Sequence, residues 1–333
     1  MNILVTGGAG YIGSHVVIEL LDSGYDVTVL DDLSLGFEEN VDRRAEFIEG
    51  NILNEQDLET ALSIQPDAVI HLGAWKAAGE SMIYPEKYTY NNIVATLKLL
   101  IAMSKAGVSK IIFSSTAAVY GYPEYLPVDE LHRIDPINYY GYTKMAIEEN
   151  LKWYSKLKGI SFVSLRYFNA AGYDAQSRVV KMERNSQNLL PIVMEIASGK
   201  RDILEIFGSD YDTPDGTCIR DYIHVSDLAS AHLKAYNFLN QCGDNLIVNL
   251  GTGDGHSVLD VVKKTVEVTK HQIPYKFVDR RVGDPESLTT SFSLAKKVLN
   301  WSPVHSELRY IIGTMWNILQ PKTNLLHPEI ESS

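Results

Sequence analysis

Tyr140 and Lys144 are the residues whose types and spacing point most directly to chemistry. They lie four positions apart in a segment with helical periodicity, so both side chains share one face of the helix. Tyrosine has a pKa of about 10 and is a poor base at neutral pH. Because a neighbouring ammonium group favours the phenolate, Lys144 is expected to help Tyr140 take a proton from an alcohol. On this pair alone, the alternative of a surface tyrosine and a solvated lysine stays open.

A glycine-rich segment at the start of the chain predicts a site beside which such a base would act. Residues 2–6 are short and apolar, which indicates a buried strand, and residues 11–21 have helical spacing. Glycine lets a backbone come close to a pyrophosphate, and the free N–H groups at a helix N-terminus favour its negative charge. The flanking strand and helix favour a dinucleotide site over a bare turn. The glycines that fit two dinucleotide-binding spacings are Gly7, Gly8, Gly10 and Gly13.

Asp31 favours NAD as the dinucleotide. It follows the second predicted strand, at 26–30, and an acid at that position bonds the ribose hydroxyls of the adenosine. A 2′-phosphate at about 4 Å from the carboxylate would be repelled by roughly 4 kcal/mol per pair of unit charges at an effective dielectric of about 20. No arginine within the next several residues would relieve this repulsion. Asp32 is expected to be a turn residue.

Thr116 adds a hydroxyl to the same region. It follows the predicted strand 110–114, so it lies at the edge of the sheet where parallel strands present their ligands. There it can bond both a substrate oxygen and the Tyr140 hydroxyl. A positively charged nicotinamide ring at this edge would, together with Lys144, favour the phenolate. Together with the glycine loop and the Tyr140–Lys144 pair, this hydroxyl makes a set that is far more specific than any one member.

Strands and helices alternate through residue 172, which predicts a doubly wound parallel sheet of the Rossmann α/β type. Ligands of such a fold bind at the carboxyl ends of the strands. Tyr140 and Lys144 lie on the last of these helices, which Gly159 is expected to end. The strands are predicted at 2–6, 26–30, 45–49, 67–72, 110–114 and 162–166, and the helices at 11–21, 54–64, 88–106 and 139–157.

After residue 172 the pattern changes, which indicates a smaller α/β C-terminal domain interleaved with the first. The polar stretch 174–185 is expected to cross to it, whereas 222–250 is expected to return to the first sheet as a strand, a helix and a strand. We therefore assign 1–172, with 222–250, to a dinucleotide-binding domain, and 173–221 with 251–320 to a substrate-binding domain. Further helices are predicted at 188–198, 258–270, 294–299 and 308–319, a short strand at 203–207 and a loose tail at 321–333.

The composition limits the classes of partner. The 333 residues carry a formal net charge of -12, which argues against nucleic acid or an anionic membrane surface as the main partner. Cys218 and Cys242 form no disulfide framework, and no cluster of side chains has metal-ligand spacing. No apolar run is long enough to span a membrane and no signal peptide precedes the first strand, so a cytoplasmic location is expected. Core histidines are expected at His15, His71 and His224.

These residues stand in longer motifs through which the chain resembles the extended short-chain dehydrogenase/reductase family, and within it the enzymes that epimerise C4 of a UDP-hexose. The resemblance runs through nearly the whole chain, from Val5 to Trp301. Its more specific stretches are Lys76-Ala-Ala-Gly-Glu-Ser81, Tyr90-Asn-Asn92, Phe113-Ser-Ser-Thr-Ala-Ala-Val-Tyr-Gly121, Tyr140-Gly-Tyr-Thr-Lys144, Arg166-Tyr-Phe-Asn169, Arg220-Asp-Tyr-Ile-His224 and Arg281-Val-Gly-Asp284.

The resemblance implies tightly bound NAD, a UDP-hexose substrate and the residues that bind them. Thr116, Tyr140 and Lys144 match the catalytic set. The positions that match NAD-binding residues are Gly7, Gly10, Tyr11, Ile12, Gly13, Asp31, Asp32, Leu33, Ser34, Leu35, Gly36, Asn51, Ile52, Leu72, Gly73, Ala74, Trp75, Lys76, Asn91, Thr116, Tyr140, Lys144 and Phe168. Asn51 stands where the family often has aspartate. The positions that match substrate-binding residues are Thr116, Tyr140, Asn169, Asn188, Leu189, Arg220, Tyr222, Arg281 and Asp284.

Arg220 and Arg281 also fit such a substrate by their chemistry. Arginine binds phosphate with paired N–H bonds, and two arginines would supply a local positive patch on a chain of net charge -12. The residues alone leave open that each arginine pairs with a neighbouring carboxylate, Asp221 or Asp284. The resemblance favours diphosphate binding.

The activity that the resemblance implies is the interconversion of UDP-galactose and UDP-glucose through a 4-keto sugar, as in galactose metabolism. Leu288 stands where family members differ in side-chain size near the hexose, and its intermediate size leaves N-acetylated UDP-hexoses open. Related dehydratases carry Asp-Glu after the threonine, whereas Ala117 and Ala118 follow here and cannot transfer protons. A non-enzymatic NAD sensor would need no aligned hydroxyl, tyrosine and lysine.

A homodimer is expected from two helices that carry more apolar surface than one buried stripe needs. Helix 88–106 is apolar on most of its faces, and Trp153 and Tyr154 add apolar surface on helix 139–157. The family resemblance also implies a dimer that packs through these two helices. The alternative is that both helices are buried on the sheet alone.

Overall fold

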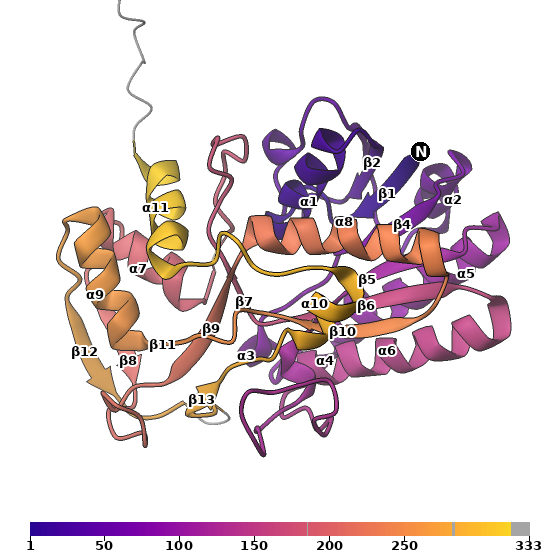
Figure 1. Cartoon of the computed structure of the whole chain (residues 1–333). Helices are drawn as coiled ribbons and strands as arrows, with labels where there is room; N and C mark the ends of the chain where they lie inside the picture. Colours follow the sequence, from indigo (N-terminus) through magenta and orange to yellow (C-terminus); the bar gives the residue numbers. More distant parts are fainter. Residues whose placement is uncertain (185, 282–283, 321–333) are drawn as a thin grey trace, which may run out of the picture.

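Seven parallel strands form the central sheet, seen at the right of Figure 1, in a computed structural model that describes residues 1–184, 186–281 and 284–320. The order β10-β6-β5-β4-β1-β2-β3 reverses between β1 and β4, and this reversal opens a crevice at the carboxyl ends of the strands. The predicted doubly wound parallel fold is thereby confirmed. The strands are β1 (Asn2–Thr6), β2 (Asp26–Asp31), β3 (Glu46–Glu49), β4 (Ala68–His71), β5 (Lys110–Thr116), β6 (Ser161–Tyr167) and β10 (Leu246–Leu250).

Helices cover both faces of this sheet because its strands are apolar on both sides. Along β1, Ile3 and Val5 pack with α1 (Tyr11–Asp22) and α8 (Val225–Cys242), whereas Leu4 packs on the opposite side. The second face is covered by α2 (Glu55–Ser63), α5 (Ala95–Ala106) and α6 (Tyr139–Lys158), and α10 (Ser293–Leu299) lies with α1 and α8. In the described part of the chain, no helix combines the length and hydropathy needed to cross a bilayer.

The ends of α6 are fixed by local signals. The Asn138 side chain accepts a hydrogen bond from the Gly141 amide at 2.8 Å, which satisfies one of the free N–H groups of the first turn. At the other end Gly159 adopts the left-handed conformation, with φ 69°, that ends many helices. These caps place Tyr140 in the first turn and Lys144 in the second turn of α6.

The long helix predicted at 88–106 is wrong in its first third. The chain forms α4 (Pro85–Tyr88), a π-helical turn (Thr89–Val94) and only then α5. The fully buried Asn92 lies in this π turn, and its side chain bonds the backbone N–H and C=O of Trp75 and the hydroxyl of Thr143. A π turn inserts an extra residue into the helix. Here it accompanies an amide that ties the loop after β4 to α6, a tertiary contact that helical periodicity does not reveal.

The second unit has its own core and two small sheets, at the left of Figure 1. Its helices are α7 (Leu189–Ala197), α9 (Val258–Thr269) and α11 (Leu308–Leu319). One sheet holds β7 (Asn169–Ala171), β9 (Ile219–His224), β11 (Gly255–Ser257) and β13 (Ser287–Leu288), and the other pairs β8 (Leu204–Phe207) with β12 (Tyr275–Val278). The predicted tail at 321–333 lies outside the described residues.

The strand predicted at 222–225 does not return to the main sheet. Instead β9 pairs with β7, which follows β6 after a break at Phe168, whereas β10 pairs with β6 at the edge of the main sheet. The chain therefore crosses between the units several times. The apolar pattern of 222–225 predicts a buried strand correctly, but it carries no information about the partner strand, which is set by long-range packing.

Candidate active site

The glycine loop after β1 packs against the loop after β4 with no room for side chains. A Cβ atom on Gly13 would lie 2.1 Å from the carbonyl oxygen of Gly7, and one on Gly7 would lie 2.5 Å from the amide nitrogen of Gly73. Gly7 also has φ 76°, which favours glycine. The loop thus brings bare backbone and the N-terminus of α1 to the crevice between β1 and β4, an arrangement that fits a dinucleotide pyrophosphate.

Asp31, the last residue of β2, fastens two loops at one end of this crevice. Its Oδ2 accepts a hydrogen bond from the Ala9 amide at 3.0 Å, and its Oδ1 accepts one from the Leu33 amide at 2.9 Å. Burial raises the pKa of Asp31, and these two amides oppose the rise. Each carboxylate oxygen keeps a lone pair, so the residue retains the capacity to accept ribose hydroxyls.

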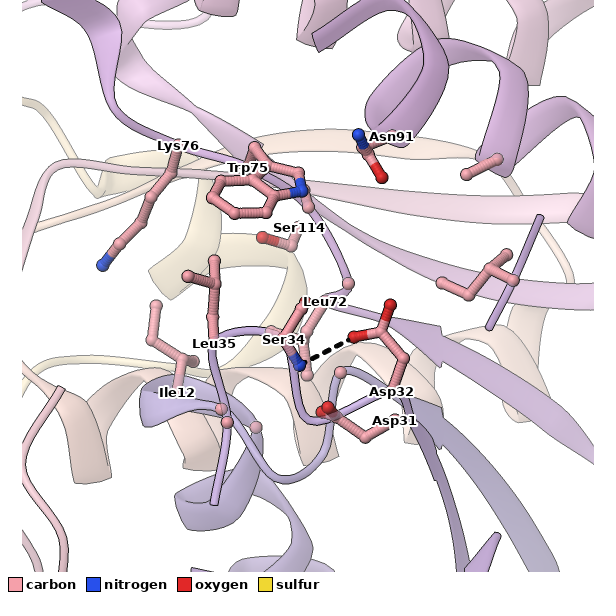
Figure 2. A pocket seen from close by; sticks show the side chains of 18 of the residues that line it. Ile12, Asp31, Asp32, Ser34, Leu35, Leu72, Trp75, Lys76, Asn91 and Ser114 are labelled. Atoms are coloured by element: carbon pink, nitrogen blue, oxygen red, sulfur yellow. Dashed lines mark hydrogen bonds between the residues drawn. The ribbon is translucent and has the colours of Figure 1, made fainter. Parts of the chain in front are cut away.

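A cavity runs along the crevice, as Figure 2 shows, with Asp31, Asp32 and Leu35 on one side and Trp75 and Asn91 on the other. It gathers most of the positions predicted to bind NAD. Of the predicted set, Leu33, Thr116 and Phe168 are not among its lining residues. The lining residues that the sequence did not single out are Leu30, Gly50, Leu53, Ala95, Ser114, Tyr167 and Glu183.

Two of these additional residues had a usable signal in the sequence. Ser114 stands in the motif that contains Thr116, and Tyr167 stands in the motif before Phe168. In the structure their hydroxyls bond each other. Glu183 had no such signal, because it lies in the crossing loop, from which it lines the cavity and forms an ion pair with Lys76.

Tyr140 and Lys144 line the cavity, and Thr116 lies beside Tyr140 without lining it. Lys144 is 2% exposed, and its Nζ donates a hydrogen bond to the carbonyl oxygen of Ser114 at 2.8 Å. The same Nζ lies 5.9 Å from the centre of the Tyr140 ring. Thr116 is hydrogen-bonded to the Tyr140 hydroxyl, and its Oγ1 also accepts from the Ala118 amide at 3.2 Å.

The protein alone does not turn Tyr140 into a phenolate, which leaves the expected contribution of a nicotinamide charge as the further requirement. Burial raises the pKa of Tyr140 to about 12, and only the hydrogen bond with Thr116 opposes the rise. Burial also lowers the pKa of Lys144 to about 7, so the ammonium charge is itself incomplete at neutral pH. The spacing placed the two groups correctly, but it omitted the cost of desolvating each charge. A further positive charge beside the phenol is needed to make it a base.

Apart from Thr116 and Tyr140, the positions predicted to bind substrate lie in the second unit. Arg220, on β9, forms an ion pair with Asp284, and the Asn169 side chain donates to the backbone oxygen of Asp221 at 2.9 Å. Asp221 itself is fully buried and accepts hydrogen bonds from the segments at 252–253 and 290. The partner of Arg220 is therefore Asp284, 64 residues away in the sequence, and not the adjacent carboxylate.

Arg281 lies over the ring of Phe207, with 4.2 Å between its guanidinium carbon and the ring centre. Arg281 and Asp284 line a second cavity, whose opposite wall is the loop at 122–126. The remaining predicted positions are Tyr222, which is buried on β9, and Asn188 and Leu189, which begin α7. Arg220 is not among the residues that line this second cavity, but its ion-pair partner Asp284 is.

Asn51 and the three core histidines have defined partners. The Asn51 side chain donates to Asp32 at 2.8 Å and accepts from the Leu53 amide at 2.8 Å. It lines the same end of the cavity as Asp31 and Asp32. His15, His71 and His224 are buried and hydrogen-bonded, and burial lowers the pKa of each. Among the described residues, no group of three histidine, cysteine or acidic side chains is arranged to hold a metal ion.

Comparison with known proteins agrees with this arrangement. A model of the NAD dependent epimerase/dehydratase family matches residues 3–251. The UDP-glucose 4-epimerase of Halalkalibacterium halodurans is 44% identical over 318 residues, which cover 95% of each chain. The structure of UDP-glucose 4-epimerase from Brucella ovis in complex with NAD superposes with a TM-score of 0.93 at 43% identity, over 96% of this chain and 98% of the other. That of the UDP-Glc/GlcNAc 4-epimerase from Campylobacter jejuni has a TM-score of 0.84 at 37% identity, over 96% and 98%.

Substitution Gly13→Ala is expected to abolish dinucleotide binding, because the added Cβ would meet the Gly7 carbonyl and force the loop out of the crevice. We expect the purified variant to carry no NAD and to bind added NAD at least about a hundredfold more weakly, in line with the loss of several pyrophosphate contacts at about 1 kcal/mol each. Calorimetric titration measures this. Gly313→Ala is the matched control, since a Cβ there meets nothing within 4 Å. Equal NAD binding by both variants would contradict the close-packed loop.

Proposed function

The chain belongs to the NAD dependent epimerase/dehydratase family, and from this premise we propose that it interconverts UDP-galactose and UDP-glucose by inverting C4 of the hexose. The observation that carries the proposal is the meeting of Thr116, Tyr140 and Lys144 beside the cavity that the glycine loop and Asp31 line. Many members of the fold bind NAD, but a tyrosine base beside the dinucleotide cavity suits chemistry on a hydroxyl of a sugar.

The residues of the cavity beside the glycine loop fit NAD. The glycine loop supplies backbone N–H groups for a pyrophosphate, Asp31 accepts ribose hydroxyls, and its negative charge disfavours a 2′-phosphate. When bound, NAD would supply an acceptor and then a donor of hydride for C4, together with a positive charge near the phenol. Tight retention follows from the chemistry, because the reaction is redox-neutral overall and the same hydrogen must return.

Tyr140 would take the proton from the C4 hydroxyl of the sugar and later return it to the same oxygen. Its phenol is held by Thr116, which also fixes its direction, and Lys144 lies one helical turn away on the same face of α6. Because burial holds the pKa of Tyr140 at about 12 in the protein alone, the base forms only when further positive charge adjoins it. Proton transfer is thereby confined to the loaded enzyme.

Arg220 and Arg281 would hold the diphosphate while the hexose turns between the two half-reactions. Arginine binds phosphate oxygens with paired N–H groups, and the ion pair with Asp284 fixes the position of Arg220 beforehand. The tether must be firm and the hexose loosely held, since the 4-keto sugar has to present its other face. The charge of the arginine patch matters the more because the whole chain carries -12.

Two related activities differ in their demands on the site. A dehydratase needs acid–base groups after the threonine, and Ala117 and Ala118 provide none. An N-acetylated UDP-hexose needs extra room, and the relevant observation is that Leu288, half-buried on β13, packs against the apolar cluster that contains Val119 and Phe168. Because leucine is intermediate in size, the N-acetylated sugar is the second candidate substrate.

The direct test of the function is an assay of the purified protein with UDP-galactose and, separately, with UDP-N-acetylgalactosamine. We expect UDP-glucose to form from UDP-galactose without added reductant, with hydrogen at C4 retained, because the hydride returns to the carbon from which it came. Tritium at C4 measures the retention. Loss of this label to water, or binding of NAD without turnover as a sensor would show, would refute the proposal. Turnover of only the N-acetylated sugar would favour the second candidate.

The variant Tyr140→Phe tests the base. It removes one hydroxyl and keeps the ring, so NAD should stay bound while kcat falls by about a hundredfold to ten-thousandfold, the usual contribution of general acid–base catalysis. Progress curves with UDP-galactose measure kcat, and absorbance measures bound cofactor. Tyr142→Phe, at an exposed position on the same helix, is the matched control. Unchanged turnover in Tyr140→Phe would remove the assigned base.

We also propose that two copies of the chain pack through α5 and α6. Ile101 on α5 is 45% exposed, and Trp153 and Leu157 on α6 are 57% and 66% exposed, so large apolar side chains remain on the outer faces of both helices. Tyr154, by contrast, packs inward on the sheet-side core. Contiguous exposed apolar surface of this kind marks an interaction site.

Light scattering of the purified protein at micromolar concentration is expected to give twice the chain mass of 37.2 kDa. Substitution Trp153→Glu places a charge in the apolar face and is expected to shift the mass to that of one chain. Val304→Glu is the control, because Val304 is 78% exposed and lies away from these helices. A single-chain mass for the unsubstituted protein would overturn the proposed dimer.

A further inference from the structure

A buried ion pair lies directly behind Lys144, and the reaction described above does not use it. Glu148 follows Lys144 by one turn of α6, so both side chains share a face of the helix. Arg166 on β6 donates to Glu148 twice, through Nε at 2.9 Å and Nη2 at 2.5 Å. Glu148 is 2% exposed and Arg166 is 4% exposed. Because a buried ion pair seldom stabilises a fold more than apolar side chains would, its presence calls for another role.

The same carboxylate also binds the strand that carries the catalytic threonine. The Ser115 hydroxyl donates to Oε1 of Glu148 at 2.6 Å, and Ser115 lies opposite Arg166 in the register of β5 and β6. Its neighbours on β5 are Ser114, whose carbonyl receives Lys144, and Thr116. The Glu148 side chain therefore joins α6 to both β5 and β6. Its contact on β5, Ser115, stands between Ser114, which Lys144 contacts, and Thr116, which Tyr140 contacts.

The opposite side of Arg166 is held as firmly. Its Nη1 donates to the Tyr120 hydroxyl at 2.9 Å, and Tyr120 donates to Oδ1 of Asn249 at 2.6 Å. The backbone N–H of Asn249 in turn donates to Oε1 of Glu130 at 2.7 Å. Glu130 follows the loop at 122–126, which lines the second cavity. The guanidinium is thus fixed from both sides, and Glu148 has a single position.

The charge of Glu148 acts on Lys144. Burial lowers the pKa of Lys144, and the Glu148 carboxylate is the group that raises it again. The buried or hydrogen-bonded ionisable groups on elements around this pair include Tyr140 on α6, His71 on β4, Arg166 and Tyr167 on β6, Glu80 on α3 (Ala78–Ser81) and Tyr88 on α4; the same elements also carry Glu86 and Lys87 on α4, Lys98 on α5 and Lys110 on β5.

These neighbours do not change charge near neutral pH. Burial lowers the pKa of His71 to about 3 and raises that of Tyr167, while a salt bridge keeps Arg166 charged. The pKa of Lys144 is about 7, so in the cofactor-free protein its charge changes between pH 6 and pH 9, whereas the charges of these neighbours do not.

We propose that Glu148 is a positioning residue of the active site: its carboxylate, paired with Arg166, keeps the Lys144 ammonium beside Tyr140 and fastens α6 to the ends of β5 and β6. The inference rests on the roles proposed for Tyr140 and Lys144. It assigns Ser115 and Arg166 to the same assembly, which links the catalytic helix through Tyr120 and Asn249 to the loop of the second cavity.

Substitution Glu148→Gln tests the electrostatic part directly. Glutamine keeps the shape and can still accept from Ser115, but it removes the negative charge that favours the ammonium. The pKa of Lys144 should fall by about one unit, the size of a typical effect of a close charge. The Cε signal of Lys144 in protein with 13C-labelled lysine, assigned with Lys144→Met, measures this titration without any turnover.

The pH profile of kcat for UDP-galactose gives the second measurement. A cationic group loses its charge as pH rises through its pKa, so a lower pKa moves the alkaline limb of the profile to lower pH. At a fixed pH above that limb, kcat of Glu148→Gln should fall by roughly tenfold for each pH unit that the limb moves, with KM nearly unchanged. A purely structural role would lower the thermal midpoint without moving the limb.

Three further variants separate charge from shape. Glu148→Asp keeps the charge and should leave the limb within a few tenths of a pH unit of wild type. Glu148→Gln/Arg166→Met leaves no unpaired buried charge, so it supplies a folded protein if the single variant unfolds, and its Lys144 should still titrate below wild type. Glu59→Gln, an exposed position on α2, is the matched control and should change neither measurement.

An unchanged Lys144 titration and an unchanged alkaline limb in the folded Glu148→Gln variant, or in the double variant, would overturn the inference. Failure of the proposed function looks different. If the unsubstituted protein epimerises neither sugar but Lys144 still titrates lower in Glu148→Gln than in the unsubstituted protein, the role of Glu148 toward Lys144 stands and the assigned reaction falls.

Discussion

The hydrogen bond from the Lys144 ammonium to the Ser114 carbonyl is the contact on which the active site depends. It places a cation at 2% exposure, where the charge is costly, and it joins the second turn of α6 to the end of β5. Tyr140, one turn earlier, and Thr116, two residues beyond Ser114, are brought together by the same junction. The caps at Asn138 and Gly159, and the Glu148–Arg166 pair behind it, all fix this one helix on the sheet.

The cost of that burial explains how the protein controls its chemistry. In the protein alone the phenol is neutral and the lysine is close to losing its proton, because both charges have been taken out of water. Reactivity thus depends on charges that arrive with the ligands or that the fold supplies nearby. This suits the proposed redox-neutral reaction, which needs the base only when the ligands are bound. A base that was ionised in the empty site would bring no benefit.

The proposed reaction also requires a firmly held nucleotide next to a hexose that can turn. The interleaved chain path serves this requirement. β6 of the main sheet leads into β7 of the small sheet, and β9, which carries Arg220 and Tyr222, pairs with β7. Arg220 is therefore held on a strand that pairs with β7, the strand that follows β6. Helix α8 follows β9 directly and packs on α1, so the glycine loop and the arginine strand are linked through one rigid path.

The sequence by itself determined the α/β fold, the glycine loop, the Asp31 position and the shared helix face of Tyr140 and Lys144. These features are written in local periodicity and in short motifs, and the family comparisons confirm the resemblance that the motifs suggested. Only the tertiary structure decided that β9 leaves the main sheet, that Asp284 is the partner of Arg220, that Asn92 lies in a π turn, and that Glu183 lines the cavity. It also decided the protonation of Tyr140 and Lys144. Each of these depends on contacts between distant segments and on exclusion of water, and neither leaves a trace in the spacing of neighbouring residues.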